Sequence, residues 1–323
     1  MKTAICSIAK NENNYLLEWV TYHINLGFSH IYIYDNNDED GEQIEDVLEE
    51  HLGNNVSIID CRGKKRHQAT AYTEFYQLFG DQYHWVAYID IDEFITFTNK
   101  SKLLYIEDYL KTIKGFDIIH LNWMSYGDNE IVEYDSNNVL ERFTKPLPFD
   151  KCIQYNFPEN NHVKSIIKGR LNLGGVQITP HSPSGNFSIC DEMGIKRSEN
   201  SYFKPFSYEV AYIRHFTTKT VYEWLKKIAR GRATVNSKSD LYSIDRFFKY
   251  NEKTIEKQNV IKYFLLFKSV MKNQSKLELN ILNRELDTLK EENIKLDMRL
   301  SKVTKSKAYR IGKLLLKPLS YLK

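Results

Sequence analysis

The sequence predicts an α/β protein with a mostly parallel sheet and a C-terminal coiled coil, and three observations support this prediction. Short apolar segments alternate with amphipathic helical segments over residues 3–92. Each predicted strand in this region ends in polar or charged residues, as expected of a sheet that binds a ligand at one edge. A heptad pattern appears near the C-terminal end. We therefore expect a sheet-based domain with a mixed second half, followed by C-terminal helices and a coiled coil.

The composition is that of an ordinary soluble globular protein, since 42% of the 323 residues are hydrophobic and 27% are charged. The net charge of +3 is too small to indicate a nucleic-acid partner. The four cysteines are Cys6, Cys61, Cys152 and Cys190, and they form no C-x-x-C pair. This spacing argues against a zinc site and a disulfide framework and favours a reducing compartment. No segment approaches the roughly 18 apolar residues of a membrane-spanning helix, and the stretch Ala4–Ala9 is too short for a signal peptide. We expect a cytoplasmic protein.

Strands and helices alternate regularly in the first half. The predicted strands are residues 3–9, 30–34, 56–60 and 84–89, and the predicted helices are residues 12–26, 43–52 and 68–79. A glycine directly follows each helix, as is common at helix ends: Gly27, Gly53 and Gly80. One face of the first helix is expected to be buried: Leu16, Leu17, Val20 and Ile24. Helices of this length between strands indicate βαβ units and therefore parallel pairing.

The second half is less regular. Residues 115–215 contain most of the prolines and are predicted to form short strands and loops, with a strand at 117–121 and a polar loop at 122–134. Helices resume near Thr220 and continue to the C-terminal end.

The strongest local feature is an acidic pair that follows the fourth predicted strand, Asp90 and Asp92. In extended backbone, residues two apart point to the same side, so both carboxylates are expected to face one point beyond the strand. Carboxylate oxygens are hard ligands suited to Mg²⁺ or Mn²⁺. Asp38 and Asp40 have the same spacing, but they lie in a polar turn, where solvation or helix capping is the simpler interpretation. Only the first pair ends an apolar strand, and there we expect a metal ion.

A heptad seam runs through the C-terminal region. Its a and d positions are Leu279, Leu282, Leu286, Leu289, Asn293, Leu296, Leu300 and Val303. This seam predicts a coiled coil, and an asparagine at an a position favours a parallel homodimer. The alternative is one long helix that packs on its own domain.

The last stretch, residues 305–323, is basic and contains no acidic residue. Apolar residues line one helical face, although Pro318 would kink or end the helix: Ala308, Ile311, Leu315, Leu319 and Leu322. Such a segment is typical of peripheral contact with an anionic surface, here the cytoplasmic face of an inner membrane. Intramolecular docking of a terminal helix fits the pattern equally well.

An ordered set of motifs resembles glycosyltransferase family 92 and its bacterial family 2-like relatives. The set extends over residues 3–232 and consists of Ala4–Glu12, Glu18–Trp19, Gly27–Phe28, Ile31–Asn36, Lys65–Gln68 with Tyr72, Trp85–Phe94, Asn122–Trp123 with Gly127, His215–Lys219, Glu223–Trp224, Lys227 and Arg230–Gly231. The ending from Ser306 to Pro318 also resembles the tails of bacterial polysaccharide glycosyltransferases.

The resemblance implies a GT-A type nucleotide-binding sheet joined to a mixed acceptor-binding half, and an inverting, metal-dependent hexosyl transfer. The implied donor is a UDP-hexose, with galactose or glucose as the sugar, and the implied acceptor is a growing surface glycan or glycolipid. Mn²⁺ or Mg²⁺ would stabilise the charge of the departing diphosphate. The implied metal ligands are Asp90, Asp92 and His215.

The resemblance also implies a nucleotide-sugar site. Its expected residues are Ser7, Lys10, Asn11, Glu12, Asp35, Asn36, Arg66, Gln68, Asp90, Ile91, Lys219 and Arg230. Inversion needs a general base for the acceptor hydroxyl. Asp191 is the first candidate and Asp128 the second, with Glu130 and Glu192 as neighbouring options. Relatives often carry serine where this chain has Asp128, so the resemblance does not assign that role.

We expect four regions: a glycosyltransferase domain (1–232), a helical extension (233–274), a coiled coil (275–304) and a basic amphipathic tail (305–323). Three other classes are a sugar-nucleotide-binding pseudoenzyme, a sugar nucleotidyltransferase and a coiled-coil scaffold of a glycan-assembly complex. The intact acidic pair argues against the pseudoenzyme, and the lack of glycine between Ser7 and Glu12 argues against the nucleotidyltransferase. A scaffold would leave the first 230 residues without a purpose.

Overall fold

The computed structural model describes most of the first 230 residues and little of the rest. The described ranges are 1–64, 67–129, 131, 133–146, 158–183, 185–197, 207–230 (backbone alone for 228–230), 247, 250–251, 294–296, 298–299, 301–302 and 305. Contacts divide the chain into two units, Met1–Thr254 and Ile255–Lys323, and the described residues of the second unit are helical. Most of the predicted dimer seam, and nearly all of the predicted extension and tail, lie outside the described residues and stay predictions.

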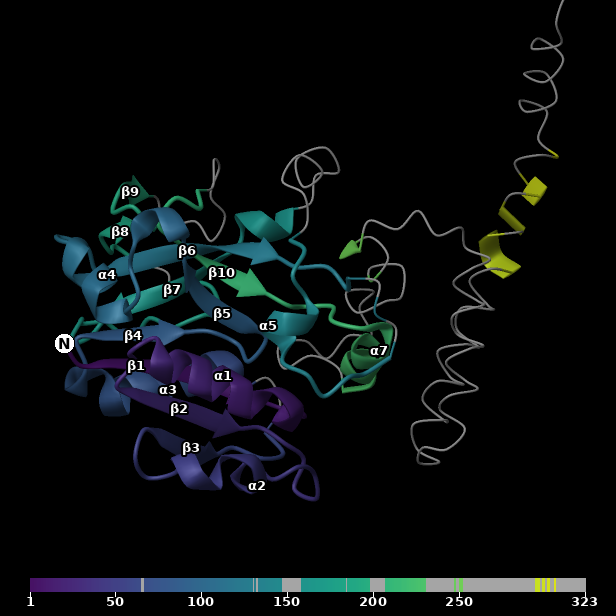
Figure 1. The fold of residues 1–323 in the computed structure, drawn as a ribbon, viewed down its shortest axis with the longest axis horizontal. Helices are drawn as coiled ribbons and strands as arrows, with labels where there is room; N and C mark the ends of the chain where they lie inside the picture. Colours follow the sequence, from purple (N-terminus) through teal and green to yellow (C-terminus); the bar gives the residue numbers. More distant parts are fainter. Residues whose placement is uncertain are drawn as a thin grey trace, which may run out of the picture. The chain divides into compact units, whose positions relative to one another are not determined.

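Four parallel strands form the first half of the sheet: β1 (Thr3–Ala9), β2 (His30–Asp35), β3 (Val56–Asp60) and β4 (Trp85–Tyr88). They lie in the order β3-β2-β1-β4 (Figure 1). All four therefore end at one edge of the sheet. The predicted parallel pairing of this half is confirmed.

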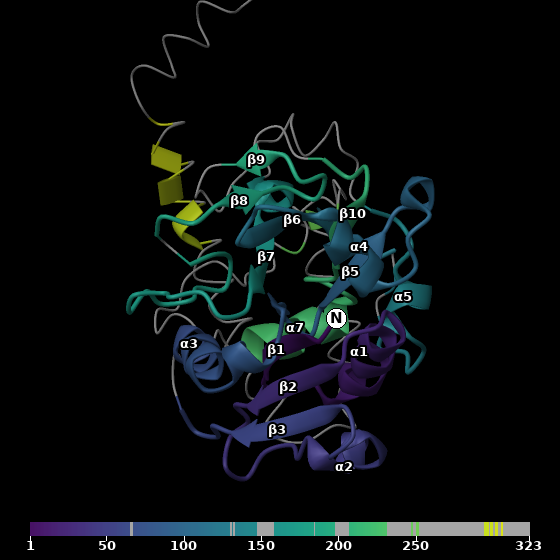
Figure 2. The ribbon, with the colours of Figure 1, turned by 90° about the vertical axis from the view of Figure 1, so that its left-hand side faces the viewer.

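Three helical segments connect these strands: α1 (Asn13–Asn25), α2 (Glu45–Leu48) with a 3-10 turn (Glu49–His51), and α3 (Gln68–Phe79). Alternate residues of β1 face two different cores, because Ile5 packs with the α1 side chains while Ala4 and Cys6 pack with those of α3. Thus α1 and α3 cover opposite faces of the sheet (Figure 2).

The second half adds β5 (Glu93–Phe97), β6 (Ile118–Ser125), β7 (Val163–Lys168) and β10 (Ala211–His215). The sheet continues from β4 in the order β7-β6-β10-β5, with β7 antiparallel to both of its neighbours. The short pair β8 (Ile189–Cys190) and β9 (Lys196–Arg197) extends from β6. The remaining helices are α4 (Ile106–Thr112), α5 (Val139–Arg142) and α7 (Val221–Arg230), with further 3-10 turns at Gly80–Gln82, Asn99–Ser101 and Pro158–Asn161.

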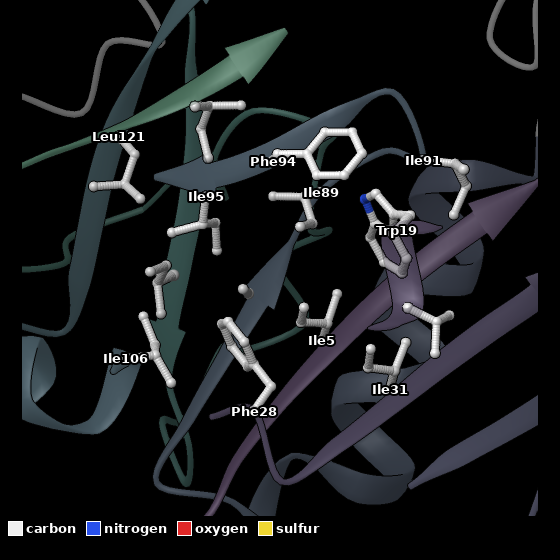
Figure 3. Close-up of a cluster of buried hydrophobic side chains, with 14 of the residues drawn as sticks. Ile5, Trp19, Phe28, Ile31, Ile89, Ile91, Phe94, Ile95, Ile106 and Leu121 are labelled. Carbon is white, nitrogen blue, oxygen red and sulfur yellow. The ribbon is translucent and has the colours of Figure 1, made fainter. Parts of the chain in front are cut away.

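Several details differ from the sequence-based prediction, among them the helix predicted at 43–52, which is shorter. The predicted strand at 117–121 begins at Ile118 and continues to Ser125, so Trp123 lies in β6 and not in a loop. On α1, Leu17 is 51% exposed, while Trp19 and His23 are buried instead. Trp19 is buried because it packs beside Phe94 and Ile91 in the core (Figure 3). Its indole N–H also donates to the Glu93 carbonyl over 2.7 Å. Among the described residues, no helix combines the length and apolar character needed to cross a membrane.

Candidate active site

The acidic pair lies in a tight turn between β4 and β5. The Glu93 amide donates to the Asp90 carbonyl over 3.1 Å and closes this turn. Ile91, between the two aspartates, is buried in the core. The backbone at Asp90 and Asp92 is therefore a turn and not the extended strand that we expected, and each carboxylate has its own hydrogen-bond partners.

Asp90 is held on the side of α3 and β7. Its Oδ1 accepts from Gln68 Nε2 over 2.7 Å and from the Tyr72 hydroxyl over 3.2 Å. Its Oδ2 lies 2.7 Å from Lys164 Nζ. Gln68, predicted to bind the nucleotide sugar, thus orients the acidic turn.

Lys164 also reaches the neighbouring Glu93, whose Oε2 lies 3.2 Å away. Both side chains are almost completely buried. Burial raises the pKa of Glu93 well above its ordinary value, although Lys164 opposes that shift. Lys164 is one of two lysines in β7, and Glu93 directly follows the acidic pair, but no local pattern in the sequence indicated that the two side chains meet.

Asp92 is held on the opposite side of the turn by α7 and β10. Its Oδ2 lies 2.6 Å from Lys227 Nζ, and its Oδ1 lies 3.7 Å from His215 Nε2. Burial alone would raise the pKa of Asp92, but Lys227 and His215 outweigh it and hold the pKa below its ordinary value. Burial lowers the pKa of His215 from 6.5 to about 3, so the imidazole is neutral at physiological pH.

Three of these side chains offer ligand atoms that all lie within 4.8 Å of one another: Asp92, Glu93 and His215. The predicted set contained Asp90 in place of Glu93. His215 and Asp92 lie close together, and Asp90 contacts Lys164 and α3; the metal ligands stay a prediction.

The beginning of α7 is anchored by a buried network that the sequence did not reveal. Glu223 forms a bidentate pair with Arg142 at 3.0 and 2.9 Å and accepts from the Tyr15 hydroxyl over 2.8 Å. Thr220 and Glu223 cap the helix reciprocally. Next to it, Lys219 is buried with its Nζ 4.2 Å from the centre of the Tyr15 ring. Burial lowers the pKa of Lys219.

The ends of β1 and β2 gather the groups predicted to contact the nucleoside. Asp35 is fully buried; its Oδ1 accepts from the Asn37 amide over 2.9 Å and its Oδ2 lies 3.4 Å from Arg62 Nε. Asn11, at a positive φ of 52°, donates its amide to Asn37 Oδ1 over 2.7 Å. These contacts join the two strand ends into one polar surface at the carboxyl edge of the sheet.

Other predicted nucleotide residues take several roles. Asn36 ties the β2 end to the chain after β3 by donating to the Cys61 and Lys64 carbonyls. Lys10 Nζ lies 2.7 Å from Asp38 Oδ1. Ser7 is buried within β1, and Glu12 is largely buried just before α1. Arg66 and the Arg230 side chain lie outside the described residues.

The two predicted catalytic bases are placed differently. Asp191 accepts from the Met193 and Ile195 amides and lies 2.6 Å from Arg197, so its carboxylate closes the β8–β9 turn. It follows β8, which is three strand spacings from β4, or roughly 14 Å. The first candidate is therefore not brought to the site.

Asp128, the second candidate, follows β6 at the carboxyl edge, where the Tyr126 amide donates to the His215 carbonyl. It is largely buried, and its amide donates to Asn251 over 2.7 Å. Of the neighbouring options, Glu192 accepts from the Glu209 amide, and Glu130 lies outside the described residues.

Trp123 forms one wall of this region together with histidines from three segments. Its ring centre lies 4.1 Å from that of His215, 4.9 Å from His162 and 5.5 Å from His181. The row brings together Trp123 of β6, His215 of β10, the residue before β7 and the loop after it.

The comparison that decides the family is a match to the family model for glycosyltransferase family 92, which extends over residues 3–251. The chain belongs to glycosyltransferase family 92. The match contains every element of the acidic turn and of the two strand ends described above.

Among family 92 proteins, one from Arabidopsis thaliana is 31% identical over 175 residues, and one from Oryza sativa subsp. japonica is 30% identical over 100 residues. These stretches cover 52% and 31% of this chain. They cover 28% and 17% of the two relatives, so the chain matches well under half of their length.

Solved structures show a weaker likeness. The TarS 1–349 structure from S. aureus is 11% identical with a TM-score of 0.36 and covers 83% of this chain and 79% of that chain. HddC from Yersinia pseudotuberculosis is 12% identical with a TM-score of 0.29, and the match covers 52% of this chain and 74% of HddC. TM-scores this low do not establish a shared fold.

Proposed function

We propose that this family 92 chain is a metal-dependent, inverting glycosyltransferase. It would move a hexose, galactose or glucose, from a UDP-sugar to a growing surface glycan or glycolipid. The observation that carries the proposal is the convergence of Asp92, Glu93 and His215 at the carboxyl edge of a parallel sheet. Ligands of such sheets bind at that edge.

A GT-A type fold is part of this proposal. The parallel order β3-β2-β1-β4 supports a nucleotide-binding half, and β7, antiparallel to both neighbours, marks the change to a mixed half. The acidic turn lies between the two halves, where a donor and an acceptor would meet.

The donor atoms suit a divalent ion. Two carboxylates and a neutral imidazole are acceptable ligands for Mn²⁺, and less so for Mg²⁺, which prefers oxygen. Within the described part of the chain, Glu93 Oε1 and His215 Nδ1 are buried without a hydrogen-bond partner, which is expected of groups arranged for a ligand. Asp92, Glu93 and His215 would hold the ion, and the ion would stabilise negative charge on the departing diphosphate.

The groups at the β2 end fit a uracil base. Uracil presents one N–H between two carbonyl oxygens, so it needs an acceptor flanked by donors. Asp35 Oδ2 is an acceptor 3.4 Å from the donor Arg62 Nε, and both atoms are buried without a hydrogen bond in the described chain, as is Asn37 Nδ2. This supports UDP as the nucleotide of the donor.

Asp128 is the better candidate for the general base, because Asp191 is committed to Arg197 and the β8–β9 turn. Asp128 lies after β6 on the edge that also carries His215. A base must reach the acceptor hydroxyl on the side of the sugar opposite the departing group.

Three further expectations complete the proposal. The seam from Leu279 to Val303 would form a parallel homodimer, and the basic tail at 305–323 would contact an anionic membrane surface. The chain would then act in the cytoplasm, peripheral to the inner face of the membrane. Truncation after about Lys272 would leave a monomer by light scattering if the seam forms the dimer.

The test is sugar-nucleotide turnover with Mn²⁺, comparing wild type with Asp92→Asn and with Asp40→Asn. Asp40 is a matched control, because it belongs to the exposed acidic pair of the same spacing. We expect Asp92→Asn to lower the release of UDP and transfer by about 10²-fold or more, since it removes charge from the metal and diphosphate, and Asp40→Asn to match wild type. Metal-dependent turnover that survives in Asp92→Asn would contradict the proposal.

A further inference from the structure

Four buried side-chain atoms near the acidic turn have no hydrogen-bond partner within the described part of the chain. They are Trp123 Nε1, Ser125 Oγ, His215 Nδ1 and Glu93 Oε1. A buried polar atom is nearly always paired, because otherwise it loses its hydrogen bonds to water and gains none in return. Unpaired atoms that gather in one place are therefore expected to face a ligand.

Strand pairing places the four residues on one face of the sheet. In the order β6-β10-β5, His215 pairs with Ser125 on one side and with Glu93 on the other. Paired residues of neighbouring strands point to the same face, and the strands are about 4.8 Å apart. Trp123 precedes Ser125 by two residues in β6 and so faces the same way. Its ring centre lies 4.1 Å from that of His215.

Two of the four residues are explained by the proposed metal. Glu93 and His215 belong to the cluster that would hold the ion, so an ion gives them a partner. Trp123 and Ser125 remain, and both groups are neutral: the indole N–H can only donate, while the hydroxyl can donate or accept. A phosphate group gains most beside a cation, so this pair does not fit it well. The hydroxyl groups of a sugar both accept and donate, and they match the pair.

We infer that Trp123 and Ser125 bind hydroxyl groups of the donor's hexose and so contribute to the choice of the sugar that is transferred. This inference rests on the proposed function, in which Glu93 and His215 hold the metal beside the diphosphate. The hexose of a sugar nucleotide is bonded to that diphosphate, and Ser125 is one strand spacing from His215. The next groups along this face are therefore those that the hexose meets.

Burial indicates the direction from which the hexose arrives. Ser125 is completely buried, whereas Trp123 is partly exposed. The sugar therefore reaches the pair over the Trp123 ring, with Ser125 at the deeper end. Hydrogen bonds formed there are little weakened by competing water, so they discriminate well between sugars.

The experiment measures the affinity for UDP, UDP-galactose and UDP-glucose by isothermal titration calorimetry in the presence of Mn²⁺. The proteins are wild type, Ser125→Ala, Trp123→Phe and the control Ser101→Ala, whose hydroxyl donates to the Thr98 carbonyl over 2.7 Å in the 3-10 turn after β5. In Ser125→Ala and Trp123→Phe, the affinity for the UDP-hexose that wild type turns over should fall about three- to tenfold, as expected for one lost hydrogen bond. The affinity for UDP should stay the same, and Ser101→Ala should match wild type with every nucleotide.

Thermal unfolding without nucleotide separates sugar binding from a structural role. The Ser125 hydroxyl has no partner to lose in the described chain, so Ser125→Ala should unfold at the wild-type temperature or higher. Ser101→Ala should unfold at a lower temperature, because it does lose a hydrogen bond. A lower unfolding temperature for Ser125→Ala, together with wild-type affinity for the UDP-hexose, would make Ser125 a structural residue and overturn the inference.

The remaining outcomes distinguish the inference from the proposed function. If the variants bind the UDP-hexose as wild type does, or lose affinity for UDP by the same factor, the inference fails while turnover by wild type keeps the proposed function. Unchanged donor affinity with slower transfer would assign the pair to the acceptor sugar and also overturn the inference. If wild type turns over no UDP-hexose with Mn²⁺, both fail.

Discussion

The two sides of the acidic turn differ in how they hold a carboxylate. On the α3 side, Asp90 receives two neutral donors and one deeply buried lysine. On the α7 side, Asp92 faces a lysine from a helix and a neutral histidine. The first side is formed by α3 and β7, and the second by α7 and β10.

The two aspartates of this motif therefore differ in what they contact. Asp90 has every oxygen committed, so it fixes the turn and keeps Lys164 compensated. Asp92 contacts Lys227 and lies in the cluster with Glu93 and His215, so it is the carboxylate to which the proposal assigns the ion. The same acidic spacing in the sequence thus has two physical roles.

The largest expected effect concerns the two lysines. Lys164→Met should lower the free energy of unfolding by about 3–5 kcal/mol, because it leaves Asp90 and Glu93 buried without a partner charge. Lys227→Met should lower it by less, because it leaves one buried carboxylate, Asp92, without its partner charge instead of two. Urea unfolding measures both. Equal losses would remove the distinction between the two sides.

The next effect is a loss of stability in mild acid on the α7 side. The pKa of His215 is lowered by burial from 6.5 to about 3, so between these values the unfolded chain binds more protons than the folded one. Stability therefore falls as pH decreases below about 6.5, by at most about 1.4 kcal/mol per pH unit for this group. Unfolding series at pH 7, 6, 5 and 4 should show a shallower slope in His215→Asn. A slope identical to that of wild type would contradict the burial argument.

The smallest effect tests the anchor of α7. Tyr15→Phe removes the hydroxyl that donates to Glu223 and should cost about 1 kcal/mol, the net value of one hydrogen bond. The Arg142 pair and the Thr220 cap remain, so the helix stays in place. The exposed Tyr105→Phe is the control in the same denaturation assay. If the two variants unfold with equal free energies, the Tyr15 hydroxyl contributes nothing to the anchor.

Local patterns predicted the first half of the fold well. The bounds of β1, β3 and α3 are those expected from apolar periodicity, and the polar strand ends do lie at one edge. Each of these elements is decided by residues close in sequence, such as the glycine after a helix or the alternation of one strand. The family assignment from ordered motifs is likewise confirmed.

The rest of the site depended on contacts between distant residues. Lys164 lies in the site because β7 inserts between β4 and β6, and no local pattern specifies that order. Glu93 replaces Asp90 in the cluster because the backbone turns after β4, where the sequence suggested a continued strand. Asp191 looked available in the sequence, but the nearby Arg197 and two amides occupy it.

The central claim is that Asp92, rather than Asp90, binds the metal. Anomalous diffraction at the manganese edge, from crystals grown with Mn²⁺ and UDP, tests it most directly. We predict a peak bonded to Asp92 and His215. A nucleotide bound at the carboxyl edge with no manganese peak beside Asp92 would contradict the account.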